Sequence, residues 1–500
     1  MSVFKPLPLG ERIPPSPHAV SCSLPRMRDV RGYEEKDAET MRHLTSGYPR
    51  FVVHPYARKL AEHLAATTPL LADRTIWLTS SARMATQLAE FLGPEVHKHA
   101  FAGDTLHGVS HPHSPELHSR AKTYLQNIGG FLSSREAEDH LVRLRLLPQV
   151  HAEPVFASNA GAEVRRVLRT ALPRATDADL LLANSGMNAV YAAFRASAEI
   201  QAARRRTVWL QLGWLYLDTI AILKRFTATP ADYVYVRNPL DHDAIARIFE
   251  KHGARIAGVI AELPTNPLIQ TPDVPALTNL CRQYGAHLIL DPSISSAFDV
   301  DVLEYSTALV SSLTKYTASD GDVIAGMVAI NPANFDAAEL RQRVAAHLEP
   351  VYPRDLARLA AQIGETRDLL QRIHTTTAQV ATFLQNHPKV REVYWALRPE
   401  SRDNYLKIAR APDAVGGMIS FTLRTSMERF YDRLRLPKGP SFGMKTTLIC
   451  PFMYLAHYDL VTTPAGIAEL AASNLDPDLL RLCCGTESAE EIIKALDEAL

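Results

Sequence analysis

The strongest constraint on the fold of this chain is an alternation of short, continuously apolar runs with helical segments between residues 166 and 335. The apolar runs lie at 180–183, 207–210, 256–261, 287–290, 308–311 and 323–330. Strands that are apolar on both sides are typical of a parallel sheet whose two faces are covered by helices. We therefore predict an α/β fold with a mainly parallel sheet for this region.

The regions on either side have different patterns. Prolines at positions 6, 8, 14, 15, 17 and 25 disfavour regular structure in residues 1–60, so we expect an arm that leads into a helix at about Ala57. A mixed insertion at about 70–165 contains an expected strand at 76–78 and a helix at 82–92. The large domain would then cover residues 61–335, with this insertion inside it.

Residues 336–500 are expected to form a separate, smaller α+β domain. Helical patterns come first, at 337–347, 354–374 and 377–387. Strand-like runs follow at 418–423 and 446–449, and the chain ends in a helical pattern at 488–500.

A histidine-rich segment lies inside the insertion. Its spacing is irregular, prolines and glycines interrupt it, and it has neither an HExxH motif nor an acidic partner pattern. We interpret the segment as a solvated loop rather than a metal site. The histidines are His97, His99, His107, His111, His113 and His118.

The composition limits the classes of partner. The chain has 500 residues, of which 46% are hydrophobic and 22% charged, and its basic and acidic residues are equal in number. No global charge favours nucleic acid or an anionic membrane. The five cysteines form no CxxC pair, and no apolar stretch is long enough to span a bilayer. We expect a cytoplasmic protein that acts on small molecules.

The chemistry is predicted by the motif Ser311-Ser312-Leu313-Thr314-Lys315-Tyr316, which puts a lysine just past an apolar strand. Asp291 ends the preceding strand. Ligands of parallel α/β sheets bind beyond the carboxyl ends of the strands. A lysine amine at that edge suits a Schiff base with pyridoxal phosphate (PLP), and Asp291 would pair with its pyridine nitrogen. Lys315 is therefore the predicted catalytic residue and proton carrier.

Other polar residues at the same edge would bind the cofactor. Ser185, Gly186 and Met187 follow a strand and open a helix, where backbone N–H groups and the helix dipole receive a phosphate. Ser312 and Thr314 would add hydroxyl groups to that phosphate site. Asn266, which follows the strand at 256–261, would reach the ring hydroxyl of the cofactor. The chain has neither GxGxxG nor GxxxxGK[ST], which disfavours a dinucleotide or nucleotide-phosphate site.

Taken in order, these motifs resemble the Cys/Met-metabolism PLP-dependent enzymes of fold type I. The resemblance covers about two thirds of the chain and is closest to the long, fungal-type cystathionine γ-synthases. It implies an aspartate-aminotransferase-like large domain followed by a smaller C-terminal domain. The matching segments are 184–187, 262–267, 288–291, 312–316, 322–326 and 481–487, and those of the fungal type are 18–21, 32–35, 46–51, 132–138 and 455–459.

The resemblance also implies roles for further residues. Tyr216 would stack on the cofactor ring and help the leaving group depart, and Ser293 would contact the cofactor beside Asp291. Arg481 would hold the substrate α-carboxylate through a bidentate pair. Thr446 and Thr447 would bind substrate, with Thr446 in the place of a glutamate that short family members use for γ-specificity.

The resemblance further implies an oligomer. Tyr48 and Arg50 resemble a pair that reaches the cofactor phosphate of a neighbouring subunit, so we expect a homodimer or homotetramer with shared active sites.

The implied reaction is γ-replacement on an amino acid with a γ-leaving group. The simplest version joins an O-acyl homoserine to cysteine through a vinylglycine-type intermediate and yields cystathionine, the trans-sulfuration reaction. A specialised variant would use another leaving group, such as that of S-adenosylmethionine, and another nucleophile. Two alternatives remain open: a γ-lyase that forms a 2-oxo acid and ammonia, and a non-catalytic protein with the same fold.

Overall fold

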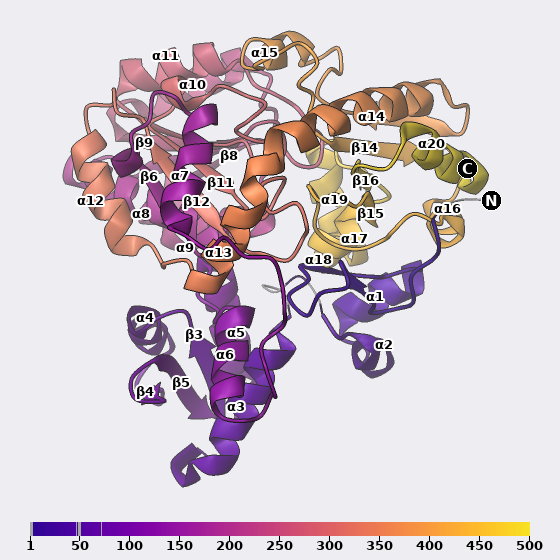
Figure 1. Cartoon of the computed structure of the whole chain (residues 1–500). Helices are drawn as coiled ribbons and strands as arrows, with labels where there is room; N and C mark the ends of the chain where they lie inside the picture. Colours follow the sequence, from indigo (N-terminus) through magenta and orange to yellow (C-terminus); the bar gives the residue numbers. More distant parts are fainter. Residues whose placement is uncertain (1–3, 47, 49–51, 72) are drawn as a thin grey trace.

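A seven-stranded sheet forms the centre of the computed structural model, which describes residues 4–46, 48, 52–71 and 73–500 (Figure 1). Its strands are β6 (Leu180–Ala183), β7 (Val208–Leu212), β8 (Tyr233–Val236), β9 (Ile256–Glu262), β10 (His287–Asp291), β11 (Ala308–Ser312) and β12 (Gly326–Ile330). The spatial order is β6-β12-β11-β10-β9-β7-β8. β12 is antiparallel to both of its neighbours, and the other pairs are parallel. The predicted mainly parallel sheet is confirmed.

Helices cover both faces of this sheet because successive side chains of each strand point to opposite faces. In β7, Leu210 packs into one apolar cluster and Trp209 into the other. The first cluster includes side chains of α7 (Ala160–Ala171), α10 (His242–His252) and α11 (Val274–Tyr284). The second includes side chains of α8 (Gly186–Ala203), α9 (Leu217–Phe226) and α12 (Ala337–His347).

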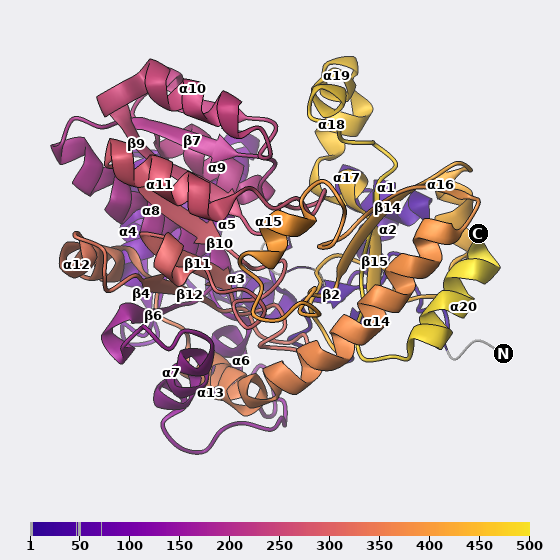
Figure 2. The same cartoon turned by 90° about the horizontal axis from the view of Figure 1, so that it is seen from above.

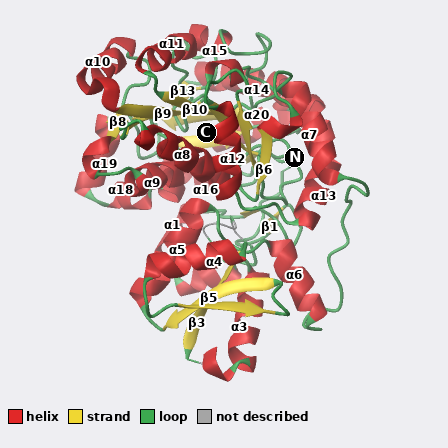
Figure 3. Cartoon of the chain, turned by 90° about the vertical axis from the view of Figure 1, so that its left-hand side faces the viewer, coloured by secondary structure: helices red, strands yellow, loops and turns green. Residues whose placement is uncertain are grey.

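The insertion forms a lobe of its own below the large sheet (Figures 1 and 3). Its antiparallel sheet has the order β3-β5-β4, with β3 (Arg74–Thr79), β4 (His97–Phe101) and β5 (Leu106–Pro112). The helices of the lobe are α3 (Pro55–Thr67), α4 (Ala82–Leu92), α5 (Pro115–Ile128) and α6 (Ser134–Arg143).

The prediction that the histidine-rich segment forms a loop is wrong, because four of its six histidines lie on the strands β4 and β5. Residues 102–104 all have positive φ and form the turn that joins these strands. The two strands pair in register, with His97 opposite Ser110 and Phe101 opposite Leu106. Gly103 therefore lies in the turn of a hairpin and Pro112 at its end, rather than in one continuous loop. In the described ranges, no three histidine, cysteine or acidic side chains form a group suited to a metal ion.

The N-terminal arm contains more regular structure than expected. It forms a short hairpin of β1 (Arg12–Ile13) and β2 (Ser21–Cys22), followed by α1 (Met27–Glu35) and α2 (Ala38–His43). The prolines do not prevent these helices, since Pro25 comes before α1. The arm packs on the C-terminal domain, where the Tyr431 hydroxyl donates to the Leu24 carbonyl at 2.8 Å.

The C-terminal region contains a four-stranded antiparallel sheet with the order β13-β14-β16-β15. The strands are β13 (Val390–Tyr394), β14 (Met418–Leu423), β15 (Leu448–Pro451) and β16 (Leu480–Cys483). The helices are α13 (Pro353–Gln362), α14 (Thr366–Asn386), α15 (Arg402–Leu406), α16 (Met427–Arg433), α17 (Phe452–Ala456), α18 (Tyr458–Thr462), α19 (Pro464–Ala472) and α20 (Ala489–Ala499).

The predicted helix boundary between residues 374 and 377 is wrong. The break lies at the short 3-10 turn Ile363–Glu365, and α14 then continues without interruption beside α20 (Figure 2). Burial of Thr376 and Thr377 compensates for their low helix propensity. Among the helices of the described chain, none combines the length and the apolar composition that crossing a membrane requires.

Candidate active site

One cavity lies at the carboxyl ends of the central strands, where β9, β10 and β11 end at Glu262, Asp291 and Ser312. It brings together most of the residues predicted from the sequence, although they lie far apart along the chain. The predicted residues that line it are Tyr48, Ser185, Gly186, Met187, Tyr216, Asn266, Asp291, Ser293, Ser312, Thr314, Lys315 and Arg481.

Lys315 projects its amine into the cavity from the turn after β11. Its Nζ donates to the Ser441 hydroxyl at 2.6 Å and lies 4.7 Å from the ring centroids of both Tyr48 and Phe442. Ser441 has a φ of 80°, a strained value for a residue with a side chain. The backbone at Ser441 is therefore held in an unfavourable conformation. In this conformation the Ser441 hydroxyl accepts the hydrogen bond from Lys315.

The N-terminus of α8 lines one end of the cavity. Ser185 caps this helix by accepting from the Asn188 backbone N–H at 3.1 Å. A Cβ on Gly186 would lie 2.8 Å from the Ser312 Cβ, so only glycine lets the helix approach the turn after β11 so closely. The Ser312 N–H donates to the Ser293 hydroxyl at 2.8 Å, and Thr314 hydrogen bonds the Ala325 backbone. Helix dipole, N–H groups and hydroxyls suit a phosphate here.

Two carboxyl groups lie side by side at the ends of β9 and β10. Asp291 is the parallel partner of Glu262, and its Oδ1 accepts from the Ser293 N–H at 2.9 Å. Burial raises the pKa of Asp291 to about 6. Burial, and then the neighbouring Asp291, raise the pKa of Glu262 well above its usual value. A cationic ring nitrogen would stabilise the ionised form of Asp291.

Glu262 also fixes the start of α9. The backbone N–H of Tyr216 donates to Glu262 Oε1 at 2.5 Å. Tyr216 is the N-cap residue of α9 and makes no cap bond with its own side chain, so the Glu262 carboxyl anchors the residue at which the helix begins. One glutamate therefore connects the Asp291 carboxyl with the position of Tyr216.

Arg481 is presented by β16 on the C-terminal side of the cavity. Its Nη1 donates to Asn266 Oδ1 at 3.3 Å and its Nη2 to the Ser441 carbonyl at 3.2 Å. The guanidinium lies 4.6 Å from the ring centroid of Phe452 and 5.1 Å from that of Phe442. These contacts fix the plane of a cation that is suited to a carboxylate.

Two predicted residues, Thr446 and Thr447, do not line the cavity. The Thr447 hydroxyl instead donates to Glu487 at 2.6 Å and accepts from the Gly485 N–H at 2.8 Å. Tyr48 lines the cavity of its own chain, and its contact with a neighbouring subunit stays a prediction. Arg50 lies outside the described residues.

No sequence pattern assigns a role to several residues of the cavity. Glu262 lies in the matching segment 262–267, in which only Asn266 has a predicted function. Ser441 carries no sequence signal, because its importance comes from a backbone conformation and from a lysine far away in the chain. Phe442, Phe452 and Leu455 also line the cavity, and their apolar character alone does not distinguish them from core residues.

The fold and this site define a class of protein, the PLP-dependent enzymes of fold type I. The lysine amine, the buried carboxyl and the glycine-lined helix N-terminus fit the aldehyde, the ring nitrogen and the phosphate of that cofactor. The chain belongs to the family described as "Cys/Met metabolism PLP-dependent enzyme", whose model matches residues 157–500.

The chain is similar to several characterised relatives. It is 38% identical to the L-2-amino-4-chloropent-4-enoate dechlorinase/desaturase of Streptantibioticus cattleyicolor, with 97% of each chain covered. It is 25% identical to the cystathionine gamma-synthase of Neurospora crassa, covering 99% of this chain and 98% of that protein.

A solved structure supports the fold. The cystathionine gamma-lyase from Lactobacillus plantarum, solved with L-serine, superposes with a TM-score of 0.57 at 18% identity over 71% of this chain and 91% of that one.

Proposed function

We propose that this enzyme eliminates a halide from the γ-carbon of a small amino acid whose side chain carries no charge. The observation that carries the proposal is the chemistry of the cavity wall. Among its described lining residues, the only lysine or arginine side chains are Lys315 and Arg481. The wall is otherwise rich in apolar residues, such as Phe442, Phe452 and Leu455. A leaving group with its own carboxylate or phosphate would be desolvated there without a partner.

The similar protein from Streptantibioticus cattleyicolor also supports elimination of a halide. It is called an L-2-amino-4-chloropent-4-enoate dechlorinase/desaturase, and its likeness extends over nearly the whole chain. Loss of chloride with one proton from such an amino acid releases HCl and leaves one additional carbon–carbon π bond. This elimination needs no oxidant, only the removal of a proton and of chloride. It therefore suits a cavity in which Lys315 can carry protons.

PLP would supply the electron sink that makes the carbons beside the amino group acidic. Lys315 would hold the cofactor and then carry protons within the substrate, since it is the amine at the centre of the cavity. Arg481 would bind the α-carboxylate, in an orientation set by Asn266 and Ser441. Asp291 would keep the ring nitrogen protonated.

Further residues would hold the substrate in place. The N-terminus of α8 with Ser312 and Thr314 would bind the phosphate. Tyr216, anchored by Glu262, would cover the cofactor ring and face the departing halide. The apolar wall would exclude water from the reacting carbons.

Gamma-replacement is the second candidate. The full-length likeness to the Neurospora crassa cystathionine gamma-synthase favours it, and the same residues would serve, with cysteine adding at the γ-carbon. A homodimer or homotetramer in the cytoplasm remains our proposal for the assembly and its location. Light scattering of the purified protein would give the oligomeric state.

A parallel substrate panel tests the proposal. The purified holoprotein is offered L-2-amino-4-chloropent-4-enoate alone, and O-acetyl- and O-succinylhomoserine each with cysteine. We expect turnover of the chlorinated substrate without cysteine. The kcat/KM for O-succinylhomoserine should be at least a hundredfold lower, a difference of about 2.7 kcal/mol in transition-state stabilisation, because its succinyl carboxylate would be buried without a partner. Cystathionine formation at comparable kcat/KM would favour γ-replacement instead.

A further inference from the structure

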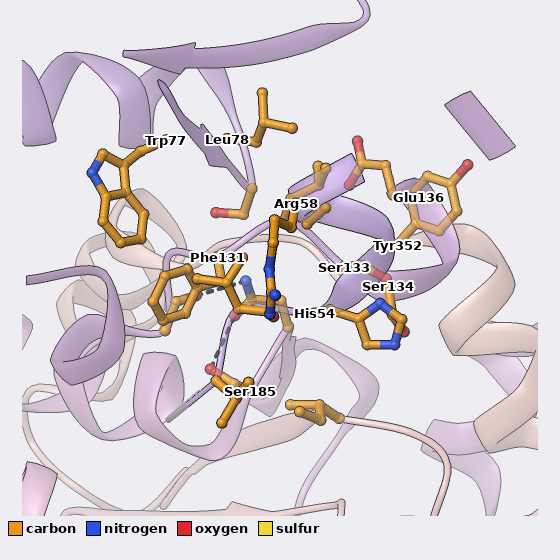
Figure 4. Close-up of a pocket in the computed structure, with 18 of the residues that line it drawn as sticks. His54, Arg58, Trp77, Leu78, Phe131, Ser133, Ser134, Glu136, Ser185 and Tyr352 are labelled. Atoms are coloured by element: carbon orange, nitrogen blue, oxygen red, sulfur yellow. Dashed lines mark hydrogen bonds between the residues drawn. The ribbon is translucent and has the colours of Figure 1, made fainter. Parts of the chain in front are cut away.

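A second cavity, of about 680 Å³, lies between the arm, the insertion lobe and the large domain (Figure 4). It is a different cavity from the candidate active site, and Arg58 and Lys122, which line it, have no part in the proposed reaction. Its size falls within the range of about 300–1,000 Å³ that small-molecule sites usually have. Apolar side chains from three regions converge in it, including Val53, Ile76, Leu78 and Phe131.

Cations without a carboxylate partner stand at the rim of this cavity. Arg58 extends from α3 between Phe131 and His54 (Figure 4). Lys122 lines the cavity from α5. Among the described residues, neither Arg58 nor Lys122 has a carboxylate within 4.0 Å. Lys36, on the arm, lines the same rim, and burial together with the charge of Lys36 lowers the pKa of Lys122.

The acidic residues of the lining do not neutralise these cations. Asp355 is paired with Arg135 at 2.8 Å and Asp322 with Arg358 at 2.9 Å. Burial, Asp355 and Asp139 raise the pKa of Glu136 to about 8, so that this carboxyl is largely protonated at pH 7. Outside the lining, Glu34 faces Lys36 and Lys122, and burial raises its pKa to about 7. Three cations, Arg58, Lys36 and Lys122, therefore outweigh this one partly protonated carboxyl at neutral pH, and the interior of the cavity is apolar.

The cavity shares a wall with the cofactor site. Ser185 and Ile324 line both cavities. The C-terminal end of α5 packs on the turn that carries Ser185: the Asn184 Nδ2 donates to the Gly129 carbonyl at 2.8 Å, and a Cβ on Gly129 would lie 2.1 Å from Ser185 Oγ. A molecule in the second cavity would therefore touch the turn that holds the cofactor phosphate.

We propose that the second cavity is a binding site for an organic anion with an apolar body, held by Arg58 and Lys122 at the rim. The apolar chain would fill the space between the insertion and the large domain, and the carboxylate would meet the two cations. This site is distinct from the catalytic cavity, and occupancy would act on the Ser185 turn that both cavities share.

Calorimetric titration of the holoprotein with decanoate tests the proposal, with the neutral decanamide as the matched ligand. We expect one decanoate per chain and weaker binding of decanamide. Each exposed ion pair contributes up to about 1 kcal/mol, so the double variant R58Q/K122Q should bind decanoate roughly fivefold or more weakly. The affinity of the double variant for decanamide should equal that of the parent. The control K59Q, one residue further along α3 and outside the cavity lining, should bind both like the parent.

A cavity-filling variant provides a second readout. Ala61→Trp places an indole inside the cavity, and it should abolish binding of both ligands while the visible absorbance of the bound cofactor persists. The proposal is overturned if decanoate does not bind, if both ligands bind equally, or if the R58Q/K122Q and Ala61→Trp variants bind decanoate like the parent. None of these outcomes depends on the identity of the substrate.

Discussion

Lys315 is oriented by three neighbours, the Ser441 hydroxyl and the rings of Tyr48 and Phe442. Replacing it by alanine removes both the covalent attachment of the cofactor and the proton carrier. We expect Lys315→Ala to lower kcat by at least about a thousandfold, because general acid–base and covalent contributions are lost together. Borohydride reduction and mass spectrometry should find a cofactor adduct on the parent and none on the variant.

Lys445→Ala is the matched control for that experiment. Lys445 is another lysine near the site, but it pairs with Asp320 at 2.8 Å and Glu365 at 2.9 Å outside the cavity. It should keep the adduct and most of the activity. An adduct that survives in Lys315→Ala would assign the Schiff base to another residue.

Asp291 should make the apoprotein less stable as the pH rises. Burial raises its pKa from 3.8 to about 6, so the folded chain binds this proton more tightly than the unfolded chain. The free energy of unfolding of the apoprotein should therefore fall between those two pH values, by about 1–3 kcal/mol from this group. Urea unfolding of the apoprotein at several pH values measures the slope.

Asp291→Asn should reduce that slope and make the apoprotein more stable than the parent at pH 7. The same variant should bind the cofactor less productively, because the ring nitrogen loses its anionic partner. An apoprotein whose pH slope is the same in Asp291→Asn and in the parent would mean that another buried group, such as Glu262, carries the effect.

At the scale of elements, the contact between the N-terminus of α8 and the turn after β11 builds the phosphate site. A methyl group on Gly186 would press on Ser312 and separate the two. We expect Gly186→Ala to weaken cofactor binding roughly tenfold, since overpacking costs about 1–3 kcal/mol. Fluorescence titration of the apoprotein with PLP measures this affinity.

Gly364→Ala is the control, because no atom outside its chain neighbours lies within 4 Å of a Cβ at that position. Its cofactor affinity should equal that of the parent. Equal affinity in Gly186→Ala would show that the α8 N-terminus has room to move and that its close approach is not required.

The sequence predicted six of the seven strands of the central sheet, because buried parallel strands are continuously apolar and their ends carry the polar residues. Lys315, Asp291 and Ser185 could be found in this way. The edge strand β8, β13, β16 and the hairpin of β4 and β5 were not predicted, since short or partly polar strands resemble loops. Ser441 could not be predicted at all: its role depends on a positive φ and on a contact across 126 positions.

At the scale of the whole molecule, Arg135 joins three parts of the chain. This fully buried residue of α6 pairs with Glu153 at 2.6 Å and with Asp355 of α13 at 2.8 Å, and it donates to the Asp322 carbonyl near the lysine turn at 2.8 Å. Arg135→Met would remove the nearest cation from the buried carboxylates Glu153 and Asp355, which keep weaker or uncharged contacts with Arg354 and Ser133. We expect a loss of about 3–5 kcal/mol in the free energy of unfolding, measured by urea unfolding.

Arg166→Met serves as the comparison, because Arg166 pairs with Glu163 on the surface at 2.7 Å. The free energy of unfolding of Arg166→Met should be less than about 1 kcal/mol below that of the parent. Similar losses in the two variants would mean that Arg135 does not hold the insertion to the large domain.

Chloride release from L-2-amino-4-chloropent-4-enoate by the purified holoprotein would test the proposed elimination directly. Ion chromatography would count the chloride, and mass spectrometry would follow the amino acid. We predict one chloride per substrate consumed, an amino-acid product lighter by one HCl, and no release by Lys315→Ala. A holoprotein that releases no chloride, yet forms cystathionine from a homoserine ester and cysteine, would contradict the account.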